Sequence, residues 1–534
     1  MRKSTYWCRV TARLSLILLP LWLIGCGAED SAVERRVAYG GDGAALVPVA
    51  RPASPPNLIV IVLDALRHDA LPLGHGQNRD VRMPHLASLA SRGVAYSNAV
   101  AAAPWTLPSM TSLLTGLQPS AHGLYTPQPH VRLVDAITTW AEILENTYDY
   151  ETVAHTAGPW FTGSGATVLQ GFGTKASDFS LRDAPGTIQH WSRMRASDRP
   201  FFLLLHTFDV HDPYGEANHP WRGQDLADPG SDPRVFVAQT FASELFRHCY
   251  TDEGMLRALT YTMGASELSR RLQRYAHAGY AESPRPELAD ELRAAYWEGV
   301  RWADGLLGQT ITCLESEGLL ENSLLVVMSD HGEAFGEHGG LAHGRILYDE
   351  LVRVPMVMAG PAPFEGGQVI TSPIGLVDVL PTFFEWAGLE AHVGIEGRSQ
   401  LALFDADQGC RPVLSEERLS YLNTGEPGDA IRLSARTEQW KYILTYDTQT
   451  RAAHEEVYDL LIDPQEIDDL GAGTGRLPPE LVFDDCFCEA VNALRERIWD
   501  RQTQPDDEAY AVPYGVSNQR PSTPPPAACR GHVD

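Results

Sequence analysis

The amino-acid sequence predicts an α/β fold in which a central, mostly parallel sheet is flanked by helices. Three continuous apolar runs predict buried strands, at residues 58–63, 201–205 and 324–328. Such runs are typical of strands that are covered on both faces. Helical patterns lie between and around the runs, at residues 83–92, 108–116, 135–145 and 288–317. Strands that alternate with helices predict a layered α/β domain.

A change of pattern near residue 395 predicts a second, smaller domain. Residues 440–444 and 456–460 form short alternating segments that suit an antiparallel sheet. The chain has 534 residues, enough for one large domain or two unequal ones. We therefore expect a main domain at residues 56–395 and a smaller α+β domain at 396–512. Residues 513–534 are polar and proline-rich, which predicts a loose tail.

The N-terminus has the features of a signal peptide over residues 1–25. Arg2 and Lys3 precede an apolar run, Leu14–Leu23, that is too short to span a bilayer. The run leads into Leu-Ile-Gly-Cys, which resembles a bacterial lipobox and implies cleavage before Cys26 and lipidation of its thiol. A plain signal peptide cleaved nearby is the alternative. Residues 26–55 predict a flexible tether, so we expect an exported lipoprotein, anchored to a membrane and facing the periplasm or cell surface.

The charge balance excludes one class of partner. The chain has 69 acidic and 42 basic residues, a net charge of −27 spread over its length. Nucleic-acid binding needs clustered lysine and arginine, so no nucleic acid is expected as a partner. A small anionic substrate stays possible, because a bound metal ion can reverse the field inside one pocket.

The cysteines indicate no metal cluster. Six remain after Cys8 and Cys26, and none has the spacing of a zinc site: Cys249, Cys313, Cys410, Cys486, Cys488 and Cys529. An exported protein can form disulfides. With one residue between them, Cys486 and Cys488 are not expected to pair with each other.

Each of the three predicted buried strands ends in polar residues that could bind a metal. The first strand leads to Asp64, the second to His206, Asp209 and His211, and the third to Asp330-His331. A single aspartate after a strand is more often a helix cap. Since ligands of open α/β sheets bind beyond the carboxyl ends of the strands, three such strands predict one shared site.

Thr106 lies where a helix is expected to begin. Pro108 suits the first turn of this helix, and Gly116 suits its end. The backbone N–H groups and dipole of a helix N-terminus favour an anion. Taken alone, a threonine in this position is more often an ordinary N-cap.

Many motifs, in order over residues 56–470, resemble those of the sulfatase family. They include Pro56-Asn57, Met83-Pro84-His85-Leu86, Thr106 to Gly116, Pro119 to Gly123, His211-Asp212-Pro213-Tyr214, Ser329 to Glu333, Gly336 to Gly339, Arg353-Val354-Pro355, Asp378, Pro381-Thr382, Val457 to Leu460 and Asp463 to Glu466. The resemblance implies an alkaline-phosphatase-like fold, with an antiparallel sheet in the smaller domain. It also implies a metal-dependent ester hydrolase.

The chain departs from the sulfatase pattern at four positions. Thr106 replaces the cysteine or serine that becomes formylglycine, and Met110 replaces the arginine that the modifying enzyme reads. Formylglycine is therefore not expected. Ala65 replaces the second aspartate of the first strand, and His343 lies where the sulfate-binding lysine is expected.

The altered site resembles that of phosphoethanolamine transferases, lipoteichoic acid synthases and phosphonate or phosphodiester hydrolases. The transferases and synthases use a threonine nucleophile with an acidic ligand and an Asp-His pair. The transferases also have a histidine in a context like Leu341 to Gly344. However, they carry several membrane helices ahead of the catalytic domain, and this sequence shows none.

These motifs assign a role to each candidate residue. Asp64, Asp330, His331 and the Thr106 hydroxyl would bind one divalent metal, with manganese or zinc favoured over calcium because one ligand is nitrogen. Thr106 would be the nucleophile. His211 and His343 would hold the remaining ester oxygens, and one of them would protonate the leaving group. Further ligands or supporting residues are sought among the nearby polar residues His155, His206, Asp209 and His338.

The predicted function is hydrolysis of a sulfate, phosphate or phosphonate ester of a small molecule, glycan or lipid. The first alternative is transfer of a phospho-headgroup to a surface glycan or lipid. The second is a catalytically degenerate binding protein. Substrate selection is expected to depend on loops such as residues 215–285.

Overall fold

The structure is a computed structural model that describes most of the two predicted domains. The described residues are 54–71, 73, 82–125, 132–134, 136–161, 168–195, 198–212, 214, 286–391, 394–405, 412–418, 430–447, 452–471, 483 and 485–503. The predicted signal peptide, most of the tether, the loop 215–285 and the tail lie outside them. Within the described ranges, no helix has both the length and the apolar composition to cross a bilayer.

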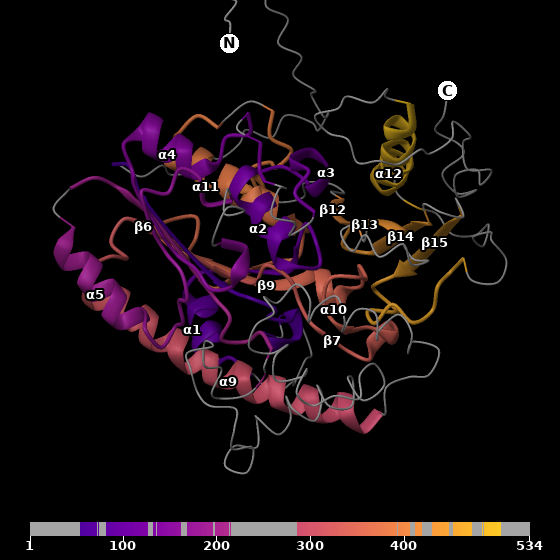
Figure 1. The fold of residues 1–534 in the computed structure, drawn as a ribbon, viewed down its shortest axis with the longest axis horizontal. Coiled ribbons are helices and arrows are strands. Elements are labelled where there is room, and N and C mark those ends of the chain that lie inside the picture. The colour runs from indigo at the N-terminus through magenta and orange to yellow at the C-terminus, as the bar shows by residue number, and fades with distance from the viewer. Residues whose placement is uncertain are drawn as a thin grey trace, which may run out of the picture. The chain divides into compact units, whose positions relative to one another are not determined.

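The central sheet has nine strands among the described residues, and most of its pairings are parallel (Figure 1). Its order is β10-β2-β9-β6-β1-β5-β3-β4, and β11 also pairs with β2. The bounds are β1 Asn57–Leu63, β2 Val94–Val100, β3 Glu151–His155, β4 Thr174–Ala176, β5 Phe201–Thr207, β6 Ser323–Met328, β9 Arg353–Ala359, β10 Gln368–Ile370 and β11 Ile374–Gly375. Only β9 runs antiparallel to its neighbours. The predicted mostly parallel sheet is therefore confirmed.

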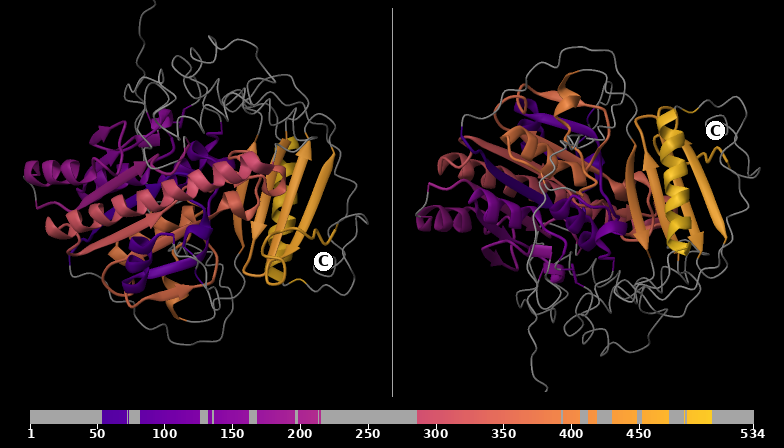
Figure 2. Two further views of the ribbon diagram at one scale, coloured as in Figure 1. Left: turned by 90° about the horizontal axis from the view of Figure 1, so that it is seen from below. Right: turned by 90° about the horizontal axis from the view of Figure 1, so that it is seen from above.

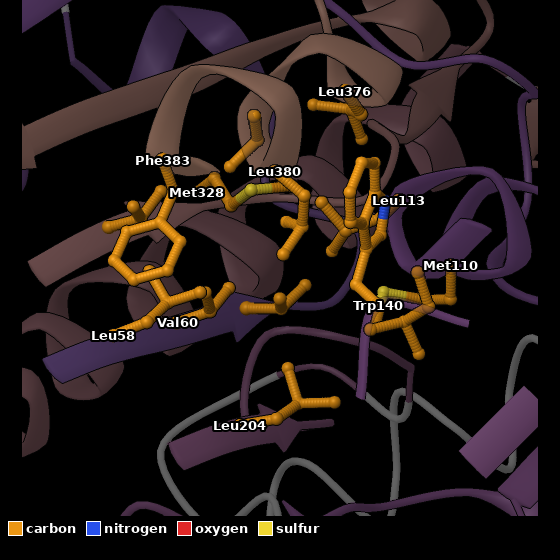
Figure 3. Packing of buried hydrophobic residues seen from close by; sticks show 14 of the residues in the cluster. Leu58, Val60, Met110, Leu113, Trp140, Leu204, Met328, Leu376, Leu380 and Phe383 are labelled. Carbon is orange, nitrogen blue, oxygen red and sulfur yellow. The ribbon is translucent and has the colours of Figure 1, made fainter. Parts of the chain in front are cut away.

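Side-chain alternation along β1 divides the core into two layers. Ile59 and Ile61 pack with α1 (Pro84–Arg92), α5 (Ala184–Met194) and α9 (Pro286–Ser316). Leu58 and Val60 face the other way, toward α2 (Thr106–Thr115), α4 (Trp140–Tyr148) and α11 (Val379–Ala387), as Figure 3 shows. Both faces of β1 are thus covered, which explains its continuous apolar sequence.

A separate sheet of four antiparallel strands follows in the described part of the chain. Its strands are β12 Val413–Arg418, β13 Ala430–Arg436, β14 Trp440–Asp447 and β15 Ala453–Asp459, in that order. Helix α12 (Asp485–Thr503) lies across one face of this sheet, as both views of Figure 2 show. A small apolar core that includes Leu433, Tyr442 and Val491 lies between the sheet and the helix. The predicted antiparallel sheet is confirmed.

Two details differ from the sequence prediction. Thr106 is the first residue of α2 and Trp105 is its N-cap, so Thr106 does not cap the helix from outside. The helix expected at residues 135–145 starts later, at Trp140, because Thr139 and Glu142 form a capping box there.

Candidate active site

The carboxyl ends of β1, β5 and β6 meet at one edge of the central sheet. Both β5 and β6 pair with β1 in parallel register. Asp64 directly follows β1, and Asp330 and His331 follow β6 after one serine. All three side chains are fully buried, so the topology brings together the three metal ligands predicted from the sequence.

Thr106, the first residue of α2, reaches the same edge from the helix layer that also contains α4 and α11. Its Oγ1 donates a hydrogen bond to Asp64 Oδ2 at 3.0 Å and lies 3.3 Å from His331 Nε2. Ser109, one turn along α2, donates to the backbone carbonyl of Asp330 at 2.7 Å. Because this bond ties α2 to the β6 loop, it fixes the distance between Thr106 and the acidic pair.

The polar atoms at this site fit a cation. One ligand atom from each of Asp64, Asp330 and His331 lies within 4.8 Å of the other two. Asp64 Oδ1 and Asp330 Oδ2 are buried and have no hydrogen-bond donor. Burying a carboxylate without compensation is costly, and a divalent metal would provide the missing positive charge. Two oxygens with one imidazole nitrogen suit manganese or zinc.

The loop after β6 fixes the orientation of His331. Its Nδ1 lies 2.9 Å from the backbone carbonyl of Gly332, and this contact assigns the ring proton to Nδ1. Nε2 is then the lone-pair nitrogen, and it faces Asp64 and Asp330 at 3.3 and 3.6 Å. Gly332 is required here because an added Cβ would lie 2.0 Å from the Glu350 carbonyl.

His206 on β5 is a fourth group at the same centre. It is fully buried, and its Nε2 lies 3.3 Å from Asp64 Oδ2 and 3.8 Å from Asp330 Oδ2. Sequence reasoning included His206 only among the additional candidates. Its place as the next-to-last residue of a buried strand was the available signal, since a histidine there is poorly explained by packing alone.

The buried histidines and acids of this site shift one another's pKa values. Burial disfavours ionised Asp64, yet His331 and His206 hold its pKa well below the usual range. Burial also disfavours the charged imidazoles, but Asp330 and Asp64 raise the pKa values of His206 and His331 to about 9 each. The site therefore attracts positive charge strongly.

His211 and His343 lie together beside this centre. The ring centroid of His343 is 4.5 Å from that of His331 and 5.0 Å from that of His211. His211 stacks on Phe208 at 4.4 Å. Burial opposes protonation of His211, but Asp212, at 2.7 Å, raises its pKa well above the usual value.

Glu333 supports His343 and was not predicted as a site residue. Its fully buried carboxylate lies 3.0 Å from His343 Nδ1 and accepts a 2.8 Å hydrogen bond from the Tyr214 hydroxyl. A carboxylate at Nδ1 directs the other ring nitrogen outward, toward the site. The sequence carried only a weak signal, because Glu333 lies inside the motif that starts at Ser329.

Three of the additional candidates have other partners. Asp209 accepts hydrogen bonds from Ser180, Leu181 and Thr207 and closes a local loop. His338 bonds to Glu350 and to the carbonyl of Glu466. His155 packs its ring against Phe179 at 5.8 Å.

Two departures from the sulfatase pattern also have structural correlates. Met110 is fully buried in the apolar layer above the sheet, so this position presents no polar group to the site. Ala65 adopts a left-handed conformation (φ 62°), which is unfavourable for alanine. The backbone turn after β1 is therefore formed with no carboxylate at this position.

Comparisons with known proteins agree with this fold. Residues 56–389 match the sulfatase family model, and residues 336–475 match the model of the N-sulphoglucosamine sulphohydrolase C-terminal region. A sulfatase of Formosa agariphila is 23% identical over 77% of this chain and 82% of its own.

Solved structures show the same fold. One, bound to its substrate D-glucosamine-2-N,6-O-disulfate, has a TM-score of 0.60 at 18% identity, with 85% of this chain and 100% of that chain covered. The phosphonate monoester hydrolase of Agrobacterium radiobacter has a TM-score of 0.56 at 17% identity, with coverages of 83% and 95%.

The fold and the match define an enzyme of the alkaline-phosphatase-like superfamily. The family match covers more than half of the sequence, and the chain belongs to the sulfatase family, a family of sulfuric ester hydrolases. The prediction of a sulfatase-family enzyme is confirmed.

Proposed function

We propose that this protein is a metal-dependent hydrolase that cleaves sulfate or phosphorus esters with Thr106 as the nucleophile. The observation that carries the proposal is the position of the Thr106 hydroxyl. It lies at the N-terminus of α2, 3.0 Å from Asp64 and 3.3 Å from His331. Asp64, Asp330 and His331 would hold the metal, and His206 is placed to join them.

A bound divalent metal would lower the pKa of the Thr106 hydroxyl and neutralise charge on the ester oxygens. Helix α2 directs its free N–H groups to the same place, and they add stabilisation for a developing negative charge. The residues around Thr106 thus supply both activation and charge stabilisation for an attack on an anionic ester.

The reaction needs two displacements. In the first, Thr106 Oγ1 bonds to the sulfur or phosphorus atom and its proton passes to Asp64, which already accepts its hydrogen bond. The ester oxygen leaves as an alcohol with a proton from His343 or His211. In the second, water gives a proton to that histidine and displaces Thr106, which recovers its own proton from Asp64.

Residue chemistry favours phosphorus esters over sulfate esters. Threonine has one hydroxyl, and it lacks the second geminal hydroxyl through which a hydrated formylglycine can expel sulfate. A threonyl phosphate or phosphonate can instead be released by attack of water at phosphorus. The likeness of the fold to a phosphonate monoester hydrolase is compatible with this preference.

The test combines substrate range with mass spectrometry. Purified enzyme, loaded with manganese or zinc, is assayed with nitrophenyl sulfate, phosphate, phosphonate and phosphodiester substrates. Acid-quenched enzyme should carry the acid group on the peptide that contains Thr106. Activity that survives complete removal of metal, or a formyl-type oxidation at residue 106, would contradict the proposal.

We also propose that the protein is exported and lipidated at Cys26. Cys486 and Cys488 are both disulfide-bonded in the structure, which supports an oxidising compartment. Cys26→Ala should move the protein from the membrane to the soluble fraction while its activity stays unchanged. Recovery of wild-type protein in the soluble fraction would exclude the anchor.

A further inference from the structure

A short hairpin carries both His343 and the carboxylate that supports it. Strands β7 (Ala334–Phe335) and β8 (Leu341–Ala342) pair antiparallel, with the first residue of β7 opposite the last residue of β8. Glu333 and His343 are therefore the next pair outward along the same hairpin, which explains why Glu333 Oε1 lies 3.0 Å from His343 Nδ1. The position of the hairpin thus fixes the position of the candidate acid.

The backbone of this hairpin is unfavourable at two positions. His338 and Ala342 are not glycines, yet both adopt left-handed conformations, with φ values of 48° and 62°. Such conformations cost free energy and persist only where the surrounding contacts hold them. The shape of the hairpin therefore depends on what its tip contacts.

His338, at the tip, contacts two other segments of the chain. Its Nδ1 lies 2.8 Å from Glu350 Oε1, in the short helix α10 (Asp349–Val352), and its Nε2 lies 2.9 Å from the Glu466 carbonyl, in the turn that follows β15. Its ring also stacks on Tyr348, with the centroids 3.7 Å apart. Because both nitrogens face oxygen acceptors, the ring donates from both and is charged. Burial opposes this charge, but Glu350 raises the pKa of His338 to about 9.

Buried ion pairs fix both acceptors that His338 contacts. The residue before the first acceptor, Asp349, lies 3.1 Å from Arg436 and 2.9 Å from Lys441 of the second sheet. Lys441 also lies 2.9 Å from the carboxylate of Glu466, which accepts a 2.6 Å hydrogen bond from the Asp349 backbone. The tip of the hairpin is thus held by groups that cannot move easily themselves.

The base of the hairpin is tied to the same helix. The backbone N–H of Glu333 donates to the Glu350 carbonyl at 3.1 Å, so Glu350 holds the base by its backbone and the tip by its side chain. Arg67, in the loop after β1, also holds both ends. It donates to the Glu333 carbonyl at 2.7 Å and to the Glu337 carboxylate at 3.1 Å.

We propose that His338 is a positioning residue, which holds the tip of the hairpin and thereby sets His343 against the oxygen of the leaving group. The inference rests on the proposed function, because it describes how the acid of that same site is held. His338 contacts Glu350, Tyr348 and Glu466, and its effect on the reaction would pass through the hairpin. The alternative is a purely structural role, in which loss of His338 would affect all substrates alike.

The test removes the contacts of His338 without adding backbone strain. His338→Asn is suitable because asparagine tolerates the left-handed conformation. The variant is assayed with an alkyl ester and a nitrophenyl ester of whichever acid group the wild type cleaves. We expect kcat for the alkyl ester to fall about tenfold, as is typical when a group that orients an active-site residue is lost. The nitrophenyl ester should be affected far less, because its leaving group needs no acid, and KM should change little for either ester.

The matched control is Asp304→Asn. The buried Asp304 carboxylate accepts hydrogen bonds from the backbone N–H groups of His85 and Leu86 at 2.9 and 3.0 Å, so this variant also weakens buried bonds. It should lower the free energy of unfolding and keep the wild-type ratio of the two kcat values. If it changes the ratio as much as His338→Asn does, the effect is one of general stability and the positioning role is overturned.

A double variant tests whether His338 acts through His343. In a His343→Gln background, His338→Asn should lower kcat for the alkyl ester little further, because both changes remove the same contribution. Full additivity of the two changes overturns the positioning role. So does an equal fall of kcat for both esters in the single His338→Asn variant.

Hydrogen exchange separates this inference from the proposed function. Backbone amides of residues 333–344 should exchange faster in His338→Asn than in the wild type, while those of α2 keep their rates. Faster exchange supports the role of His338 in holding the hairpin even if the wild type hydrolyses no ester. Unchanged exchange in residues 333–344 overturns that role, while hydrolysis by Thr106 can still hold.

Discussion

Two buried clusters of charged residues in this protein differ in how their carboxylates are paired. Around Asp349, where the short helix α10 (Asp349–Val352) contacts the second sheet, each acid lies 2.9 to 3.1 Å from a cation, within hydrogen-bonding distance. Around Asp64 and Asp330, two carboxylate oxygens are buried without a donor. In the first cluster each acid is ion-paired with a cation of the chain, whereas the second cluster holds two acids whose only nearby cationic groups are histidines at 3.3 to 3.8 Å.

The difference shows how buried charge can be interpreted. When ion pairs within the chain offset the free-energy cost of burying a charge, the charged residue has a structural role. When nothing in the chain offsets that cost, a ligand-binding role is indicated, because natural proteins rarely leave buried polar groups without hydrogen-bond partners. The following experiments test this distinction, from the largest expected effect to the smallest.

Substitution of Thr106 should have the largest effect. Thr106→Ala removes the nucleophile and should lower kcat by at least about a thousandfold, in the range found when catalytic residues are removed. Since the hydroxyl is not the N-cap of α2, the free energy of unfolding should change by no more than about 1 kcal/mol. Thr106→Ser should retain part of the activity. Steady-state kinetics and thermal unfolding are measured together, and a fully active Thr106→Ala enzyme would exclude the mechanism.

Alanine substitutions of Asp349 and Asp330 compare the two clusters directly. Asp349→Ala leaves Arg436 and Lys441 with less compensation and should cost about 3–5 kcal/mol of unfolding free energy. Asp330→Ala should not destabilise the metal-free protein to this extent, because it removes one of two mutually repelling carboxylates. It should instead abolish metal binding. Denaturant unfolding and metal analysis measure both outcomes, and equal destabilisation by the two substitutions would refute the distinction.

His338, whose ring bonds to Glu350 and to the carbonyl of Glu466, should make the free energy of unfolding depend on pH. Burial opposes its protonation, but Glu350, 2.8 Å away, raises the pKa of His338 to about 9. The folded pKa exceeds the unfolded value of about 6.5, so this contribution is complete below pH ~6.5. It is lost as the pH rises to about 9, and it amounts to no more than about 3 kcal/mol.

The control for this prediction is His338→Gln. Unfolding free energies of both proteins are measured at several pH values between 6 and 9.5. The variant should lose less stability than the wild type over this window. Parallel curves would show that the pH dependence arises elsewhere.

Glu333→Gln should have the smallest effect. It keeps the size of the side chain but removes the charge that holds His343, at 3.0 Å, and a supporting residue of this kind is typically worth about tenfold or more in activity. If His343 protonates the leaving group, kcat should fall more for alkyl esters than for nitrophenyl esters, which need no acid. Tyr214→Phe, which loses only the neighbouring hydroxyl, should change the rate less. An equal decrease for both ester types would indicate a purely structural role.

The sequence by itself determined much of the architecture and the candidate residues of the site. Apolar runs such as residues 58–63 predict strands covered on both faces, because only a buried strand needs no polar side. The same reasoning predicted that Asp64, Asp330 and His331 would meet, since parallel strands end at one edge. Family motifs drew attention to Thr106, His211 and His343.

Only the tertiary structure decided which nearby polar residues belong to the site. The sequence offered His206 and His338 alike as additional candidate site residues. In the structure, His206 faces Asp64, whereas His338 bonds to Glu350. Glu416 and Glu417 are adjacent and chemically identical, but strand alternation turns Glu416 to Ser120 and Tyr125 and Glu417 to Trp105 and Arg345. Partners of this kind come from segments far apart in the chain, so local pattern cannot identify them, and the role of a buried charge depends on those partners.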